Sequence, residues 1–226
     1  MRSVGPMSAN VAVAAHAVDS PRAWLTVVVA FFASGVTLGT AYSFGAFFES
    51  MSEEFAAANG STALIFGITT CLFFSLSIIS GRMSDRFGPR VVLVAGAAAL
   101  FIGLIATSRV QSLGLGYVTY GLGVGIAAAC GYVPMVAVVG GWFEQHRAVA
   151  VGLAVAGIGV GTLVMSPVSA ALIDRWGWRD TYVFFAVGGA GVMLACVPLV
   201  GRPPGDGSPQ PSRFEDALRS AVFRRV

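Results

Sequence analysis

The stretch from Gly81 to Arg90, GRMSDRFGPR, places three arginines and one aspartate between two long apolar runs. The runs on either side, residues 61–80 and 91–107, contain no charged side chain. Charged groups are costly inside hydrocarbon, so we expect the charged stretch to lie outside a membrane and its neighbours inside. The stretch therefore marks one side of a membrane, and the rest of the chain can be placed relative to it.

The composition supports a membrane protein. The chain has 226 residues, of which 56% are hydrophobic and 11% are charged, whereas soluble domains carry about 25% charged residues. Its 29 glycines suit helices that pack closely in lipid. The net charge is +3, but the basic residues gather at the ends of apolar runs and form no stripe with aromatic residues. This pattern argues against binding to nucleic acid.

The residues that carry enzyme chemistry are sparse. The three cysteines lie inside apolar runs without the spacing of a metal site or a disulfide framework. The two histidines, His16 and His146, fall in a tail and in a link between spans. The glycines of GLGVG (121–125) lie inside an apolar run with no strand before them, so they are no dinucleotide fingerprint. We therefore expect no enzyme activity, no metal and no cofactor.

The uncharged runs predict membrane-spanning helices, each of which needs roughly 17 to 25 residues. The predicted spans are 23–48, 62–81, 91–107, 113–140, 148–173 and 181–201. Residues 1–22 lack the apolar core of a signal peptide and are predicted to be a disordered cytoplasmic tail. Residues 202–226 are predicted to be a cytoplasmic linker that carries an amphipathic helix. The sequence thus predicts an all-α integral membrane bundle.

The arginines predict the orientation of this bundle. With the N-terminus in the cytoplasm, eleven arginines fall on the cytoplasmic side and three, Arg109, Arg175 and Arg179, on the other. The positive-inside rule then places both termini in the cytoplasm of a multi-pass protein of the cell's inner (plasma) membrane. Trp24 and Trp142 are expected at the inner membrane interface, and Trp176 and Trp178 at the outer one.

Small residues and tyrosines recur at helical spacing. In the fourth span, Gly121 and Gly125 share a face with tyrosines toward each end, a pattern that fits either a substrate groove or close helix packing. In the fifth span, Gly157 and Gly161 have GxxxG spacing, which favours helix packing. The candidate substrate-cavity residues are Tyr42, Tyr117, Tyr120 and Tyr132.

The charged stretch carries a family resemblance. The pattern Gly81-x-x-x-Asp85-Arg86-x-Gly88-x-Arg90 after a second span resembles the loop signature of the major facilitator superfamily. Residues 44–55, 132–161 and 177–179 resemble the branch with monocarboxylate and oxalate/formate transporters. The resemblance implies six transmembrane helices arranged as a 3+3 inverted repeat. These would form the N-terminal half of a twelve-span fold that works by alternating access.

The resemblance also implies roles for the residues of the charged stretch. Gly81, Asp85, Arg86, Gly88 and Arg90 would form a gating loop whose acid meets a partner in the other half of the carrier. Gly81 is expected to let the second span approach a neighbour closely, and Gly88 to allow the turn. The alternative is that the arginines only anchor topology through lipid phosphates.

This sequence departs from the family pattern at two positions. Tyr42 aligns with a lysine of some animal carriers, and His146 with an arginine of the bacterial pattern. The predicted spans hold no ionisable side chain except tyrosine and cysteine. The cation for a carboxylate substrate would therefore have to come from the missing half of the carrier.

The leading functional hypothesis is a secondary transporter of small organic anions, with a proton as the candidate coupling ion. Its partners would be the lipid bilayer, the anion, and a C-terminal half or a second six-span chain. One alternative is a truncated or assembly-only membrane chain that transports nothing by itself. A further alternative, drug efflux, shares the residues of the Asp85 loop.

Overall fold

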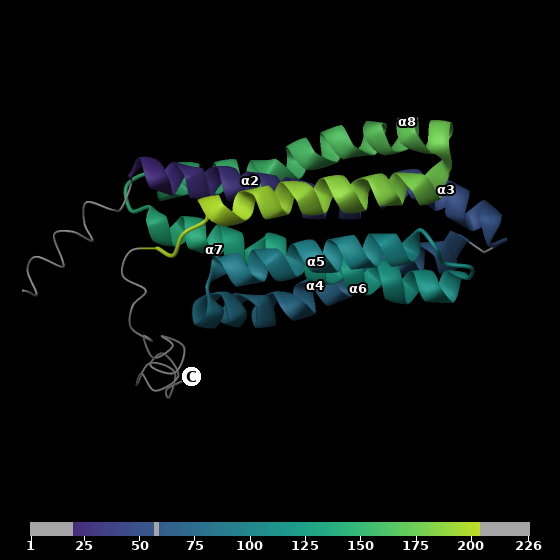
Figure 1. Cartoon of the computed structure of the whole chain (residues 1–226), viewed down its shortest axis with the longest axis horizontal. Helices are drawn as coiled ribbons and strands as arrows, with labels where there is room; N and C mark the ends of the chain where they lie inside the picture. Colours follow the sequence, from purple (N-terminus) through teal and green to yellow (C-terminus); the bar gives the residue numbers. More distant parts are fainter. Residues whose placement is uncertain (1–19, 57–58, 204–226) are drawn as a thin grey trace, which may run out of the picture.

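The computed structural model describes residues 20–56 and 59–203, and every regular element within these ranges is helical. The expected tail and linker lie almost entirely outside the described residues. The helices are α2 (Pro21–Tyr42), α3 (Phe44–Glu54), α4 (Asn59–Phe87), α5 (Pro89–Thr107), α6 (Leu113–Gly131), α7 (Val133–Trp142), α8 (Arg147–Cys196) and the short 3-10 helix η1 (Val197–Leu199). They form an elongated bundle with α3 at one end and α7 at the other (Figure 1).

Five stretches of the described chain are long and apolar enough to cross a membrane. They are Pro21–Glu54, Gly60–Phe87, Pro89–Thr107, Leu113–Trp142 and Arg147–Leu199. The last has 53 residues, far more than the roughly 20 that one crossing needs. These lengths and the absence of strands from the described ranges agree with the predicted all-α membrane fold.

The longest helix, α8, is interrupted at Gly177, where the backbone takes φ 79° and ψ 164°. A first arm (147–176) precedes this residue, and a second arm (178–196) returns along the bundle (Figure 1). Glycine adopts a positive φ without the steric cost that a side chain would add. The predicted polar link from Asp174 to Asp180 is therefore helical except at this one residue, which corrects the expected boundaries.

The stretch from Gly81 to Arg90 is also more helical than predicted. Helix α4 continues past Gly81 to Phe87, since none of these residues breaks a helix and a helix need not end where the hydrocarbon ends. The turn is confined to Gly88, which has φ 93° and donates its N–H to the Ser84 carbonyl at 2.8 Å. Pro89 then begins α5, where its fixed φ suits the first helical position. The expected loop is thus one residue between two helices.

Two predicted spans are broken inside their apolar runs. The first breaks at Ser43, between α2 and α3, where the Ala46 N–H bonds to the Ser43 carbonyl at 2.9 Å. The fourth breaks at Tyr132, which has φ −105° and ψ −72° and separates α6 from α7. Pro134 follows two residues later and has no N–H to return to the preceding turn. Each of these spans therefore consists of two helical segments rather than one continuous helix.

Fully buried aromatic rings join α3, α6 and the second arm of α8. The Phe47 ring stacks on Tyr182 with centroids 4.0 Å apart and planes 7° from parallel. The Tyr120 ring lies 5.6 Å from Tyr182 and 5.2 Å from Phe44. These rings pack α3, the second segment of the first span, against the second arm of α8.

Candidate functional site

A shallow groove lies between α2, α4 and α6. We call it the aromatic groove, and its lining residues are Leu38, Ala41, Tyr42, Phe66, Thr69, Thr70, Phe73, Phe74 and Ala128. Its volume is about 30 Å³, little more than a single water molecule requires. None of these residues is an acid or a base. The groove is therefore a neutral wall of a site rather than a complete binding cavity.

One of the four candidate tyrosines, Tyr42, lines this groove, and a second, Tyr132, packs beside its lining residue Phe73. Tyr42, the last residue of α2, is 49% exposed, and its ring centroid lies 6.0 Å from that of Phe66. Tyr132 occupies the break in the fourth span, is half-buried, and lies 6.1 Å from Phe73. The breaks in the first and fourth spans thus each place a tyrosine ring against an aromatic residue of α4.

The other two candidate tyrosines lie elsewhere. Tyr120 is fully buried in the core and donates its hydroxyl to the Thr40 carbonyl at 3.1 Å, so it does not line the groove. Tyr117 donates its hydroxyl to the Ser61 carbonyl at 2.8 Å near the start of α4. Both tyrosines face neighbouring helices because α6 lies between α4 and α5 with few exposed positions.

The hydroxyl groups of the groove differ in whether they already donate a hydrogen bond. Thr69 and Thr70 donate their protons to carbonyls of their own helix, at 2.8 and 2.9 Å. Tyr42 makes no recorded hydrogen bond within the described part of the chain. Its phenol is therefore the groove's available donor for an anionic group.

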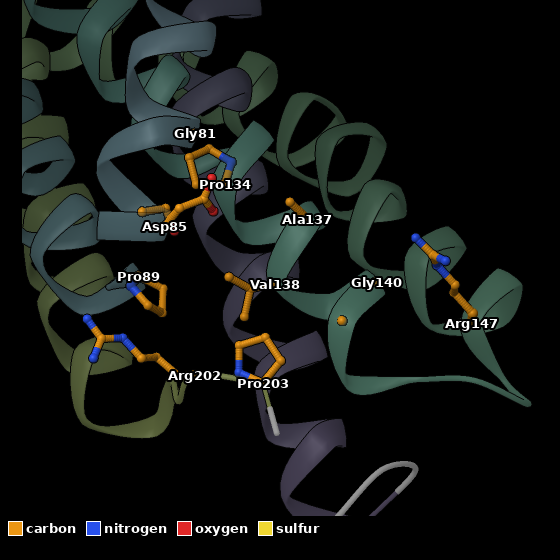
Figure 2. Close-up of a pocket in the computed structure, with 12 residues that line it drawn as sticks. Gly81, Asp85, Pro89, Pro134, Ala137, Val138, Gly140, Arg147, Arg202 and Pro203 are labelled. Atoms are coloured by element: carbon orange, nitrogen blue, oxygen red, sulfur yellow. The ribbon is translucent and has the colours of Figure 1, made fainter. Parts of the chain in front are cut away.

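A second pocket, which we call the Asp85 pocket, lies at the end of the bundle where α4 meets α5. Its volume is about 460 Å³, and its lining residues are Gly81, Ser84, Asp85, Pro89, Pro134, Ala137, Val138, Gly140, Gly141, Arg147, Arg202 and Pro203. Figure 2 shows Asp85 and Arg202 on the side away from Arg147. Among residues 20–56 and 59–203, no ion pair joins Asp85 to either arginine. The exposed carboxylate can therefore meet a partner outside this helical unit.

The remaining residues of the predicted gating loop have separate surroundings. The Arg86 guanidinium lies over the exposed Phe87 ring, 5.2 Å from its centroid. Arg90 donates from Nε to the Val200 carbonyl at 2.8 Å, so it ties α5 to the chain that follows η1. A Cβ added at Gly81 would meet no atom within 4 Å. Within the described residues, no neighbour makes the close approach that was expected at Gly81.

The packing glycines meet two kinds of neighbour. A Cβ at Gly157 would strike the Phe31 carbonyl of α2, and one at Gly161 would strike the backbone of Gly35. In α6, a Cβ at Gly121 would lie 2.9 Å from Ile68 Cγ2, and one at Gly125 would lie 3.0 Å from Leu72 Cβ. All four glycines thus lie at close helix contacts, and the contact of α2 with α8 is between backbones.

A polar cluster at the end opposite the Asp85 pocket was missed by the sequence analysis. Glu54 at the end of α3 lies 2.7 Å from Arg179 Nη2 and accepts the Trp178 Nε1 proton at 2.6 Å. Arg179 Nη2 also donates to the Val110 carbonyl at 2.8 Å. Trp178 is 5% exposed and Trp142 is 9% exposed, so two of the four expected interface tryptophans are buried, whereas Trp24 and Trp176 are exposed. No local sequence pattern indicates this cluster, because Glu54 and Trp178 are 124 residues apart in the chain.

The chain resembles known membrane carriers in sequence. Residues 23–226 match the family described as the Major Facilitator Superfamily. Monocarboxylate transporter 12 from Xenopus laevis is 32% identical over 161 residues, which cover 71% of this chain and 35% of that protein. Monocarboxylate transporter 3 from Rattus norvegicus is 30% identical over 190 residues, which cover 83% of this chain and 38% of that protein. The chain therefore spans little more than a third of the length of these relatives.

A solved structure supports the fold. The xylose transporter XylE from E. coli, in an inward open conformation, aligns with a TM-score of 0.57 at 20% sequence identity. The alignment covers 81% of this chain and 47% of that one. At this identity the likeness concerns the fold alone. The relatives are transporters by name rather than enzymes, and the family match extends over nearly the whole chain. The chain belongs to the Major Facilitator Superfamily, in its monocarboxylate transporter-like branch.

Proposed function

We propose that this chain is the N-terminal half of a secondary transporter of small organic anions, of the monocarboxylate or oxalate/formate type. The observation that carries the proposal is the convergence of two broken spans on one neutral groove, with Tyr42 and Tyr132 beside the breaks. Discontinuous helices near the middle of the bilayer are a common way for transporters to form a substrate site. The names of the relatives favour monocarboxylates as the substrate class.

The groove suits one part of such a substrate. Phe66, Phe73 and Phe74 offer apolar faces to a short carbon chain, and the Tyr42 phenol offers a hydrogen bond to a carboxylate oxygen. No lining residue carries a positive charge, so the countercharge would come from a second helical unit across the cavity. We therefore expect this chain alone to bind its substrate weakly and to require that unit for transport.

We propose six spans, arranged as a 3+3 inverted repeat with both termini in the cytoplasm. The two arms of α8 supply the fifth and sixth spans. Gly35 and Gly39, which belong to the broken first span in the first set of three, pack on the fifth span in the second set. Gly121 and Gly125, which belong to the broken fourth span in the second set, pack on the second span in the first set. In a 3+3 repeat the first span corresponds to the fourth and the second to the fifth. The contact of the first span with the fifth is therefore equivalent to that of the fourth with the second, which supports the repeat.

Alternating access would then open and close the end that holds the Asp85 pocket. We propose that Asp85, with Arg86 beside it, meets the other half of the carrier when this end is closed. The exposed, unpaired state of the Asp85 carboxylate supports this role. The alternative role is anchoring to lipid phosphates. It suits the positively charged Arg82 and Arg86, whereas the negatively charged Asp85 would be repelled by a phosphate.

Transport assays test the proposal directly. Proteoliposomes would contain either the chain alone or a twelve-span form in which a C-terminal half of the same branch follows it. We expect labelled lactate, formate or oxalate to enter only with the twelve-span form, and a proton gradient to stimulate entry. Transport by neither form would contradict the proposal. Export of large cationic drugs without anion uptake would favour the efflux alternative.

A Tyr42→Phe variant of the twelve-span form tests the groove. Loss of one hydrogen bond to an anion should raise the KM about tenfold, with a smaller change in the maximal rate. Tyr117→Phe removes the same hydroxyl at a distance from the groove and is the matched control. Equal KM values for the two variants would show that Tyr42 does not contact the substrate.

A further inference from the structure

Each helix break leaves backbone carbonyls outside the regular helical pattern, and buried hydroxyl groups lie against them. At the first break, the Thr40 carbonyl accepts from Ser43 Oγ at 2.9 Å and from the Tyr120 hydroxyl at 3.1 Å. Tyr120 belongs to α6, so this bond joins the fourth span to the first. Both Thr40 and Tyr120 are almost completely buried.

The second break has a comparable partner from a different helix. Ser80 of α4 lies 2.7 Å from the Ala129 carbonyl in the last turn of α6, and 3.0 Å from the Ser77 carbonyl of its own helix. The shorter distance is the one between helices. Ser80 is 3% exposed and Ala129 is 1% exposed. The second span is therefore tied to the fourth just before Tyr132.

Burial makes these two bonds matter for local geometry. A carbonyl that a helix break frees at the surface can turn to water, but a buried one needs a protein partner. The Tyr120 and Ser80 hydroxyls supply that partner, so they stabilise the broken form of each span relative to a straight one. Tyr42 lies two residues after Thr40, and Tyr132 lies three residues after Ala129.

We infer that Tyr120 and Ser80 are positioning residues of the aromatic groove. Each hydroxyl holds one helix break, and each break sets the direction of the tyrosine beside it. Neither residue lines the groove. The role in substrate binding rests on the proposed function, whereas the two ties concern the helical unit alone and can be tested without transport.

Hydrogen exchange of the chain in lipid nanodiscs tests the ties. Tyr120→Phe keeps the ring against Phe44 and Tyr182 and removes only the hydroxyl. We expect exchange at amides 43–46 to become about three times faster, since Ser43 Oγ stays on the Thr40 carbonyl. Ser80→Ala should accelerate exchange at amides 131–133, 135 and 136 about tenfold, because the Ala129 carbonyl loses its hydrogen bond from Ser80.

The chain offers a matched control for each variant. Tyr117→Phe removes a hydroxyl of the same helix, and Ser77→Ala removes one that bonds the Phe73 carbonyl within α4 at 2.6 Å. Each control should leave both break segments unchanged. The inference requires a crossed pattern, with each variant affecting its own break. Uniform acceleration along the chain, or no difference from the controls, would overturn it.

The positioning role has a separate readout in the twelve-span form. Tyr120→Phe and Ser80→Ala should each raise the KM for the transported anion about fivefold while the maximal rate changes less than about twofold. A crossed exchange pattern with unchanged KM values would overturn the positioning role. If the unsubstituted twelve-span form transports no anion, both the proposed function and the positioning role are refuted. The hydrogen-exchange data would still show whether the Tyr120 and Ser80 hydroxyls hold the two breaks.

Discussion

Arg90 shows how one side chain joins the start of one helix to the end of another. Its Nε donates to the Val200 carbonyl at 2.8 Å, and its Nη2 to the Pro198 carbonyl at 3.3 Å. The last carbonyls of a helix have no partner within the helix, so a charged donor there stabilises the end. Arg90 lies in the first turn of α5, and its acceptors follow the second arm of α8. The side chain thus has structural partners inside the helical unit, and the gating role that the family resemblance implies for it stays a prediction.

An Arg90→Gln variant should therefore be less stable than the parent. We expect a loss of about 1 kcal/mol in the free energy of unfolding, because a shorter neutral side chain loses two hydrogen bonds from a charged group that is largely solvated. Thermal unfolding in a mild detergent measures this loss, and hydrogen exchange should accelerate at Val200 and Gly201.

Arg86→Gln is the matched control for Arg90→Gln. Its guanidinium lies over the exposed Phe87 ring, so its loss should change the stability by no more than about 0.5 kcal/mol. Equal losses for the two variants would mean that the bonds of Arg90 to the carbonyls contribute nothing.

The sequence predicted some residue environments and not others. Gly88 was expected at a turn and takes φ 93°, because the charged residues around it required the chain to reverse outside the hydrocarbon. Tyr120 was expected at the cavity and lies in the core. Helical spacing fixes which residues share a face, but it does not say whether that face meets a neighbour or an open groove. That choice depends on how the other helices pack.

At the scale of the helices, the contact between α2 and the first arm of α8 depends on glycine. A Cβ at Gly35 would lie 2.9 Å from the Gly157 carbonyl oxygen, and one at Gly157 would strike the Phe31 carbonyl. Backbone atoms cannot move aside as the end of a flexible side chain can. The two helices therefore hold each other at a distance that only glycine permits.

We expect Gly157→Ala to destabilise the bundle by about 3 kcal/mol, near the upper end of the usual range for overpacking. Gly159→Ala is the control from the same helix, since its Cβ would meet no atom within 4 Å. That substitution should leave stability unchanged or raise it by up to about 1 kcal/mol, because alanine favours a helix over glycine. Thermal unfolding of both variants in one detergent decides the matter, and a similar loss in both would refute the packing argument.

The helix boundaries were only partly predictable. Charge and apolar length predicted spans that overlap the observed helices, because both act through the cost of burying charge in lipid. The break at Ser43 had no such signal, since the residues around it are uncharged and include no proline. The break at Tyr132 had a signal in Pro134, but the long apolar run around it led us to predict one continuous span. The hydroxyls that bond the freed carbonyls belong to neighbouring helices, so the sequence of the broken span does not contain them.

At the scale of the whole molecule, the two ends of the helical unit are closed by different contacts. One end has the bonds of Arg90 and the bond from Trp142 Nε1 to the Gly201 carbonyl at 3.3 Å. The opposite end has Glu54, Trp178 and Arg179, which join α3, the link after α5 and the turn of α8. With both ends tied, we expect the unit to move as one body during transport.

The cluster around Glu54 allows a direct test of this rigidity. Glu54→Ala removes the acceptor of both Trp178 and Arg179, and Arg179 Nη1 is already buried without a recorded partner. The side chains of Arg179 and Glu54 are 35% and 44% exposed, so solvent screening limits the expected loss to about 1 kcal/mol. Exchange should accelerate at amides 108–112 and 177–182 and stay unchanged near Val200.

The neighbouring Glu53 is exposed and provides the control, because Glu53→Ala removes the same charge without touching the cluster. A double-mutant cycle of Glu54→Gln and Arg179→Gln should give a coupling of roughly 0.5 to 1 kcal/mol. If the unit is one body, anion uptake by the twelve-span form should fall in Glu54→Ala in proportion to the folded fraction, with KM unchanged. A KM change with full stability would instead mean that this end moves separately from the groove.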